Sequence, residues 1–266
     1  NYKFSAAHSI DASIIYMQDA PAFQSAFVSP RTRNSVTPGI SAEKVFGVDA
    51  SYNFRWGDFK ARVSGYYTKF MDQSKVISYY DDVEATFSNF AMSGIDKQHF
   101  GLEVAASIPL YAGLALNGAI SWGQFTYDSN PDYVQIQDNS GEIKNEGKVY
   151  WKNFRVESTP QTAMNIGLSY RSRNNIYASI DMNYYNNMYL SMSPLYRTDA
   201  VLSRNMSAED IRELRHQEKF NSACVFNASV GKNWYINRAY TLGFSLEVKN
   251  LLNNQDIKTG GYEQIR

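Results

Sequence analysis

The side chains that could perform acid–base, nucleophilic or metal chemistry are few and scattered. The chain has three histidines, His8, His99 and His216, and one cysteine, Cys224. No histidine has a second one close by, and no metalloprotease, serine-hydrolase or dinucleotide-binding motif occurs. Cys224 falls on the apolar side of an alternating segment, whereas a catalytic thiol needs an electropositive, partly exposed setting. The sequence therefore predicts no catalytic residues, no cofactor, no metal site and no enzyme activity.

Binding is the chemistry that two polar and aromatic clusters could support. Tyr79, Tyr80 and Asp81 place two rings beside a carboxylate, which could stack on a sugar or contact a chelate. Tyr185 and Asn187 lie at the end of an alternating segment and could line a mouth. The simpler alternatives are a solvated loop for the first cluster and a boundary aromatic for the second. Both interpretations stay open for both clusters.

Charged side chains also recur on one side of the alternating segments. The candidates are Asp49, Arg62, Glu103, Asp181 and Glu247. They could contact an internal domain or a polar solute. The alternative is a solvated polar wall, which any water-filled barrel needs.

Composition excludes several protein classes. The 266 residues carry 26 Lys and Arg against 26 Asp and Glu, so no basic face is available for nucleic acid. A single cysteine excludes an internal disulfide framework. The mean hydropathy is negative and no apolar run of 18 residues occurs, which excludes a transmembrane helix. Spanning strands remain allowed because only every second residue of such a strand faces lipid.

The elements that must position these groups are strands, since apolar residues recur with a period of two. We predict strands at 9–17, 44–55, 59–68, 99–108, 114–123, 162–171, 176–187, 224–232 and 240–250. One helix is predicted at 207–219, where Ser207 precedes Asp210 as in a capping box. Its expected role is to fold over the outer mouth.

The connections between these strands alternate between long and short. Long connections are predicted at 18–43, 71–98, 124–161 and 188–223, and short ones at 56–58, 109–113, 172–175 and 233–239. Tight turns on one rim and long loops on the other are typical of outer-membrane barrels. Strands of about ten residues also match the ~9–11 that cross a bilayer at a tilt. Aromatic residues flank the strands, as in the girdles of such barrels: Tyr16, Phe54, Trp56, Phe59, Tyr67, Tyr111, Trp122, Tyr170, Tyr184, Trp234, Tyr235 and Tyr240.

Residues 16–72 resemble the C-terminal half of the barrel of TonB-dependent receptors. An aromatic–x–x–x–Ala–Pro segment is followed by a loop running from Pro38 to Glu43-Lys44. An alternating strand, a tight turn and a returning strand come next, and the last ends in the pattern of Gly65, Tyr67 and Asp72. The tail 246–266 is similar to the penultimate strand of that family, with its Val-x-Asn-Leu-Leu-x-Asn ending. Tyr150 to Phe154 and "TPQTAMNIGL" at 159–168 resemble the branch found in Bacteroides-like bacteria.

The resemblance implies an all-β fold. We expect an antiparallel up-and-down transmembrane β-barrel segment, about nine strands of a barrel of about 22 with a plugged lumen. Residues 1–266 would be one partial barrel domain without the plug domain. The short turns would face the periplasm and the long loops the outside.

The function implied is active import of a bulky scarce nutrient across the outer membrane of a Gram-negative bacterium. Siderophore, haem, cobalamin and oligosaccharide importers share this barrel, so the substrate stays open. Implied partners are the rest of the barrel and its plug, TonB through that plug, outer-membrane lipid or lipopolysaccharide, and a surface lipoprotein, but no nucleic acid. Two alternatives remain: a passive outer-membrane porin, and a soluble Tyr-rich carbohydrate-binding β-protein.

The ends of the sequence fit an internal piece of such a transporter. The first residues lack the regions of a signal peptide, and neither the plug nor the family's last, aromatic-ended strand is present. We expect one more strand after residue 266, and roughly a dozen strands and a plug before residue 1, by subtraction from about 22.

Overall fold

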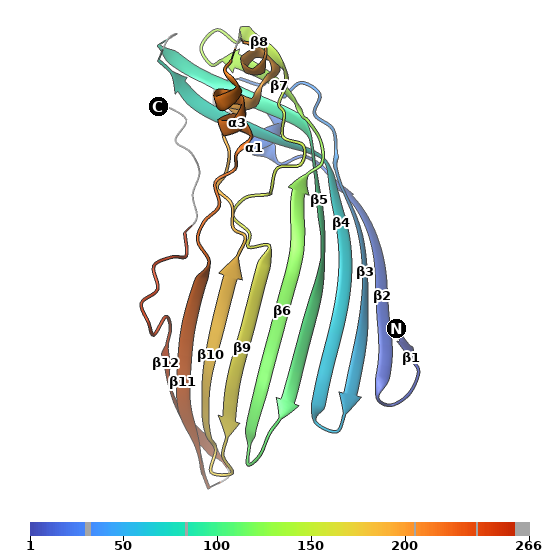
Figure 1. The fold of residues 1–266 in the computed structure, drawn as a ribbon, viewed down its shortest axis with the longest axis vertical. Helices are drawn as coiled ribbons and strands as arrows, with labels where there is room; N and C mark the ends of the chain where they lie inside the picture. The colour runs from blue at the N-terminus through green and yellow to red at the C-terminus, as the bar shows by residue number, and fades with distance from the viewer. Residues whose placement is uncertain (30–32, 83–84, 205, 238, 259–266) are drawn as a thin grey trace.

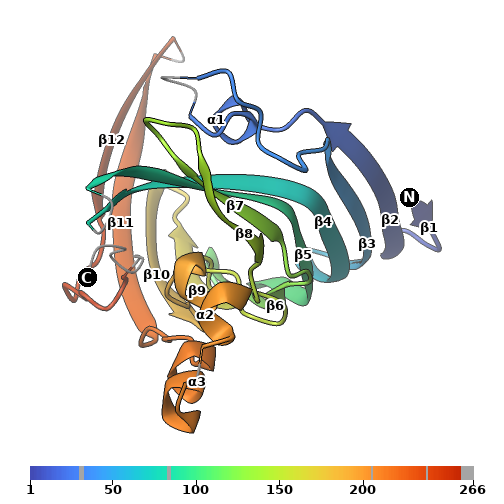
Figure 2. The same cartoon turned by 90° about the horizontal axis from the view of Figure 1, so that it is seen from above.

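One curved antiparallel sheet forms most of the molecule. The computed structural model describes residues 1–266 except 30–32, 83–84, 205, 238 and 259–266. The main strands stand side by side in the order β1-β2-β3-β4-β5-β6-β9-β10-β11-β12 (Figure 1). Seen from above, they follow an open arc with a concave and a convex side (Figure 2). This is an up-and-down meander, so the predicted all-β barrel segment is confirmed.

The strand bounds agree with the alternating segments, apart from β4 and β5, which extend well beyond them. The strands are β1 Tyr2–Lys3, β2 His8–Asp19, β3 Glu43–Trp56, β4 Phe59–Asp81, β5 Thr86–Pro109, β6 Leu114–Tyr127, β7 Asp132–Gln137, β8 Ile143–Lys148, β9 Thr162–Arg171, β10 Ile176–Asn186, β11 Ala223–Ile236 and β12 Tyr240–Val248. Each of the nine predicted strands is present. The short β1 and the pair β7 and β8 were not predicted.

The predicted long connection at 71–98 is wrong. The strands β4 and β5 continue through most of it and remain paired as far as Asp81 with Thr86. Their register shifts between Phe70 and Lys75, where Asp72 has a φ of 59°. Beyond this irregularity, Phe90, Ala91 and Met92 of β5 are buried, and Val76, Ile77 and Tyr79 of β4 are partly buried in the same clusters, which stabilises the extended hairpin. The connection is therefore a paired, packed arm.

The predicted long connection at 124–161 also contains ordered structure. Strand β7 pairs with β5 on one side and with β8 on the other. The ring of Tyr133 stacks on that of Phe90 at 4.6 Å between centroids. Both belong to a hydrophobic core that also contains Met92 and Trp151. The most continuous apolar core of the described residues thus lies in this end region, away from the main wall.

Short helices complete the end that carries the long connections. They are α1 Phe23–Ala26, α2 Asp199–Leu202, α3 Ala208–Arg215 and the 3₁₀ helix η1 Pro194–Arg197. The helix α3 confirms the predicted capping box, because Ser207 and Asp210 bond reciprocally. Figure 2 shows α3 on the convex side of the arc, so its expected place over the mouth is wrong.

No helix among the described residues is long and apolar enough to cross a membrane.

The two faces of the main wall differ in chemistry. One face exposes large apolar side chains along its strands: Val48, Leu102, Val104, Ile120, Trp122, Ile166, Ile180, Val230 and Phe244. The other face carries Ser, Asn and charged residues. Side chains of successive residues point to opposite faces of a strand, and cross-strand register keeps each set on one side.

Candidate functional site

A hydrogen-bonded polar cluster occupies the face opposite the apolar one. Arg62 Nη2 donates to Ser51 Oγ at 2.8 Å, and its Nε donates to Ser64 Oγ at 3.0 Å. Ser51 Oγ itself donates to Ser64 Oγ at 3.0 Å. The register explains the cluster, since Ser51 lies directly opposite Ser64 on neighbouring strands. The two serine hydroxyls therefore fix the orientation of the Arg62 side chain on the polar face of the sheet.

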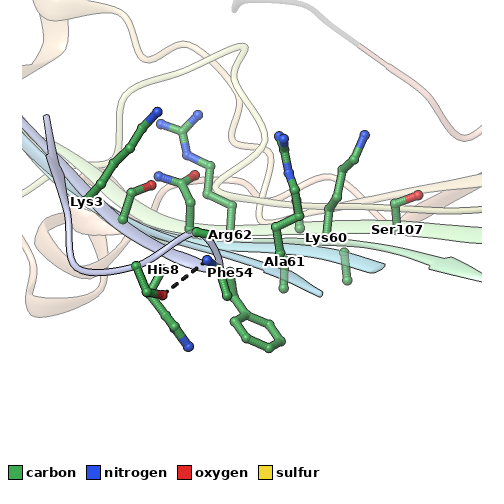
Figure 3. Close-up of a pocket in the computed structure, with 15 residues that line it drawn as sticks. Lys3, His8, Phe54, Lys60, Ala61, Arg62 and Ser107 are labelled. Carbon is green, nitrogen blue, oxygen red and sulfur yellow. Dashed lines mark hydrogen bonds between the residues drawn. The ribbon is translucent and has the colours of Figure 1, made fainter. Parts of the chain in front are cut away.

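A basic recess lies next to this cluster, at the end with the short turns. The cavity has a volume of about 490 Å³. Lys60, Arg62 and Ser107 point to one side of the sheet and Phe54 to the other (Figure 3). The β1–β2 turn closes one edge, where the Arg55 N–H donates to the Ala7 carbonyl at 2.8 Å. The recess is lined by Lys3, Ser5, Ala6, Ala7, His8, Ser9, Asn53, Phe54, Arg55, Lys60, Ala61, Arg62, Ala105, Ala106 and Ser107.

The charge of this recess favours an anionic partner. Four of the described lining residues are cationic: Lys3, Arg55, Lys60 and Arg62. None of the described lining residues is acidic. The nearby Asp11 accepts a hydrogen bond from Asn53 Nδ2 at 2.5 Å. Arginine and lysine donors arranged in this way suit carboxylate or phosphate groups.

A second polar cluster lies on β9, β10 and β11. Asp181 accepts hydrogen bonds from Asn183 Nδ2 at 2.8 Å and from Asn227 Nδ2 at 2.9 Å. Asn165 Nδ2 donates to Asn183 Oδ1 at 2.9 Å. Two amide donors thus hold the Asp181 carboxylate in place. Its hydrogen-bond partners in this cluster are asparagine side chains, which do not form an acid–base pair with it.

The other charged candidates stand apart along the same face. Asp49 accepts from Ser13 Oγ, and Glu103 lies opposite Ser64 in the register. Glu247 is 3.6 Å from Lys249 at its carboxylate, and both are well exposed. The five candidates thus share a wall without converging on one point.

The first aromatic cluster is split by its strand. Tyr79 packs against the hydrophobic core of the end region and accepts a hydrogen bond from Gln135 Nε2 at 2.7 Å. Burial raises the pKa of Tyr79 to about 12, and the Asp81 carboxylate adds to the rise. Tyr80 points elsewhere and meets the ring of Phe87 edge-on at 5.3 Å. Tyr79 is therefore a packing residue, and only Tyr80 is well exposed.

The second cluster lies where β10 ends. Tyr185 is opposite Ala163 and Ala223 in the register. Asn187 has a φ of 57°, and its Nδ2 donates to Thr162 Oγ1 at 3.1 Å, which fixes the exit of the chain from the strand. Asn187 thus has a structural role, and its substrate contact remains a proposal.

The sequence analysis missed a larger pocket at the end with the long connections, here called the flank pocket. It has a volume of about 800 Å³ and is lined by Asn130, Tyr150, Lys152, Asn153, Phe154, Arg155, Tyr189, Arg197, Leu202, Ile211, Leu214, Arg215 and Gln217. These residues come from segments far apart in the chain. The only local signal was the concentration of aromatic rings and cations at 150–155. Among the described residues, no group of His, Cys, Asp and Glu could hold a metal ion.

A comparison with protein-family models identifies one family. The model described as "TonB dependent receptor-like, beta-barrel" matches residues 1–251. The structure is similar to "Copper transporter OprC", with a TM-score of 0.59 and 16% identity, over 95% of this chain and 32% of that one. It is also similar to the FrpB iron transporter from Neisseria meningitidis, with a TM-score of 0.55 and 16% identity, over 95% and 34%.

A third similar structure is P. aeruginosa FpvA bound to heterologous pyoverdines, with a TM-score of 0.54 and 12% identity, over 94% of this chain and 28% of that one. A search of curated proteins finds no match. At these identities the likeness to solved structures shows the fold. The chain spans about a third of the length of the structures it matches.

Proposed function

The chain belongs to the TonB-dependent receptor β-barrel family, and on that premise we propose that it forms part of the wall of an outer-membrane active transporter. The whole transporter would import a bulky scarce nutrient, driven through TonB and a plug inside the barrel. The location proposed is the outer membrane of a Gram-negative bacterium, with the long connections outside. Residues 1–266 would be one partial barrel domain of it.

The observation that carries this proposal is the opposition of the two faces. Large apolar side chains are exposed on the face that Phe54 shares, while the face of Arg62 holds a hydrogen-bonded polar network. A soluble sandwich would bury the apolar face against a second sheet. Among the described residues no second sheet covers it. An apolar face turned to lipid and a polar face turned to an aqueous lumen satisfy both sets of side chains.

The basic recess supports a contact with the plug. Its four cations lie at the short-turn end, which this family places on the periplasmic side. Carboxylates of a plug domain would pair with them, and the desolvation cost would stay small where such pairs remain in contact with the water of the lumen. The charged candidates Asp49, Arg62, Glu103, Asp181 and Glu247 would line the same interior.

The substrate class proposed is a bulky nutrient such as a metal chelate, haem, cobalamin or an oligosaccharide. The names of similar structures mention copper, iron and pyoverdines. Candidate contacts are the exposed Tyr80 and the partly buried Asp81 of the β4–β5 arm, and Tyr185 and Asn187 at the end of β10. These contacts, rather than catalysis, would determine what is taken up.

Uptake by cells carrying or lacking the full-length gene tests this function. The probes are a labelled ferric siderophore, haem, cobalamin and a maltooligosaccharide, each with and without a protonophore. We expect one probe to require both the gene and an energised inner membrane. Uptake that needs the gene but ignores the protonophore would support a passive channel. A protein extracted from cells without detergent would favour the soluble alternative.

A further inference from the structure

A small cavity lies where the extended arm of β4 and β5 begins, here called the bulge cavity. It has a volume of about 140 Å³ and is lined by Gln73, Ser74, Lys75, Ile95, Lys97, Tyr127, Trp151 and Glu157. These residues come from β4, β5, the end of β6 and the connection that follows β8. The bulge cavity shares no described lining residue with the basic recess or with the flank pocket.

The irregularity in β4 brings three consecutive residues to this cavity. In a regular strand, successive side chains point to opposite faces. Gln73, Ser74 and Lys75 nevertheless all contribute to the lining, because the register with β5 shifts on both sides of Gln73. Bulges of this kind recur beside functional sites, where they redirect side chains.

Hydrogen bonds hold the irregular segment in place. Asp72 has a φ of 59°, a left-handed conformation that is uncommon for residues other than glycine. Its N–H donates to Asp96 Oδ1 at 3.0 Å, and its carboxylate pairs with Lys44 Nζ at 2.7 Å. The Asp96 N–H donates to Ser129 Oγ at 2.7 Å, and that hydroxyl donates to the Gly94 carbonyl at 2.7 Å. The cavity is therefore preformed.

Three buried polar atoms of the lining lack a hydrogen-bond partner among the described residues. They are Gln73 Oε1, Ser74 Oγ and Trp151 Nε1. Buried polar groups in folded proteins are paired, and an unpaired one points to a bound water or ion. The indole N–H is a donor only, so the partner it lacks is an acceptor. Gln73 offers an acceptor as it stands, and exchange of its amide oxygen and nitrogen offers a donor instead.

The charge of the lining favours an anion over water alone. Glu157 is the one acidic residue among the described lining residues, against the two cations Lys75 and Lys97. The Tyr127 hydroxyl donates to Glu157 Oε2 at 2.9 Å, and Lys75 Nζ lies 4.0 Å from its Oε1. Lys97 is half-buried, with its Nζ 5.6 Å from the centroid of the Tyr127 ring, and it forms no ion pair with a described residue. A cation that is partly removed from water without a counter-ion is costly, and a bound anion removes this cost.

The bulge cavity belongs to the polar face of the wall. Lys97 precedes Glu103 by six residues on β5, so strand alternation puts both side chains on that face. Tyr127 lies directly opposite Lys97 in the register. The side chain of Lys75 is 45% exposed, so dissolved ions can reach the lining.

We propose that the bulge cavity binds one small monovalent anion, either chloride or a small carboxylate such as acetate. The Lys97 ammonium, the Trp151 N–H and the Ser74 hydroxyl would donate to it, since hydrogen bonds to a charged partner are the strong ones. A cavity of about 140 Å³ admits such an ion with some water and excludes a bulky organic anion. The bound anion would join β4, β5 and the connection after β8. This site does not depend on which nutrient is imported.

Crystals of the full-length protein grown with sodium bromide locate the anion. Bromide is the probe because it replaces chloride and scatters anomalously. We expect an anomalous peak within hydrogen-bond reach of Lys97 Nζ and Trp151 Nε1. A bulge cavity that contains only water would overturn the proposal.

Hydrogen exchange of the same protein in detergent measures the affinity. The ionic strength is held constant with the sodium salt of the bulky sulfonate MES, which chloride, bromide or acetate gradually replaces. A ligand that binds the folded state suppresses local opening, so exchange at 70–76 and 150–157 should slow as the small anion is added. Protection by chloride and bromide alone would identify a halide site, and protection by acetate a carboxylate site. Exchange that is the same in all four salts would reject the proposal.

Two substitutions in the lining and one beside it provide the matched comparison. Lys97→Gln should raise the anion concentration for half-maximal protection by roughly tenfold and remove the bromide peak. Trp151→Phe keeps a ring but loses the N–H donor, and should also weaken protection. Lys152→Gln removes the same charge next to Trp151, from a side chain that is 53% exposed and lines the flank pocket, and should leave binding unchanged.

An equal loss with Lys152→Gln would show diffuse attraction rather than a site and would reject the proposal. A bromide peak that persists in Lys97→Gln would reject it as well. Heat-modifiability on gels checks that each variant is folded.

Discussion

At the scale of single residues, the face that a side chain occupies determines its role. Ile120 is exposed among apolar neighbours, whereas the preceding residue, Ala119, lies opposite Ala105 and Asn165 on the polar face. Ser51 illustrates a limit of strand alternation. It lies on the polar face but is 3% exposed, because Arg62 and Ser64 cover it. An arginine at Ser51 would therefore be poorly tolerated, contrary to what alternation alone suggests.

Ile120→Arg should destabilise the assembled protein by about 2–4 kcal/mol, because it puts a charge into hydrocarbon. Ala119→Arg should cost much less, since its side chain enters water. Urea unfolding of the full-length protein in lipid vesicles measures both values. Equal costs would contradict the assignment of the two faces.

The half-buried phenol of Tyr79 makes the end region sensitive to alkali. Its pKa is about 12 in the folded protein, against about 10 in an unfolded chain. The folded state therefore holds this proton more tightly, and the resulting stability is complete below pH ~10 and is lost as the pH rises to about 12. Difference titration by tyrosinate absorbance should show the step near pH 12, and Tyr79→Phe should remove it. Titration of Tyr79 near pH 10, with no step near pH 12, would show that Tyr79 is not buried.

At the scale of elements, the end region behaves as a small packed unit on top of the wall. The extended β4–β5 arm and the β7–β8 hairpin share the core of Phe90, Met92 and Tyr133. This packing makes residues 128–147 part of the folded end region. Removing them would expose the apolar side of the arm to water.

Tyr133→Ala should destabilise the end region by about 3–5 kcal/mol through the cavity it creates. The strands β9 to β12 should persist, because their ladder contacts do not involve this core. Limited proteolysis should then cleave within 73–95 while β9 to β12 stay protected. Asn145→Ala on the partly exposed β8 is the control. Unchanged protease resistance at 73–95 would mean that the hairpin adds little to the packing of the arm.

The helix α3 depends on its cap. Ser207 accepts a hydrogen bond from the Asp210 N–H, and Asp210 accepts one in return from the Ser207 N–H. Ser207→Ala should cost this short helix about 1 kcal/mol. Hydrogen exchange at residues 209–215 should accelerate by roughly fivefold, with no change in β10. Exchange that stays unchanged would show that the contacts of Ile211 and Leu214, rather than the cap, hold the helix.

At the scale of the whole molecule, the arc has two unpaired edges. The strand β12 has a partner on one side only among the described residues, and the short β1 covers just two residues of β2. Unpaired backbone groups cost several kcal/mol each in hydrocarbon, so an open edge there is not tolerated. In water, the same edges beside an exposed apolar face promote aggregation.

These 266 residues expressed alone should therefore aggregate or remain bound to chaperones. The full-length protein should instead give a heat-modifiable band in outer membranes. Membrane fractionation and gel mobility without boiling compare the two. A monodisperse, detergent-free monomer of the 266 residues would contradict the membrane assignment.

The nine main strands and their faces were predictable from the sequence alone, because an alternation of apolar and polar residues records locally which side of a strand is buried. The sequence also predicted the capped helix at Ser207 and Asp210, since a capping box lies within four residues. It did not predict the continuation of β4 and β5, nor the pair β7 and β8. The side chains of these segments are buried by contacts between distant parts of the chain, such as Phe90 with Tyr133.

Which polar groups meet depends on the three-dimensional fold. It placed Tyr79 in a core and separated it from Tyr80, and it gave Arg62 its two serine partners through cross-strand register. The flank pocket arises in the same way. Arg155, Arg197 and Arg215 are brought to one cavity by pairing and packing across some sixty residues of chain, a relation that local spacing cannot record.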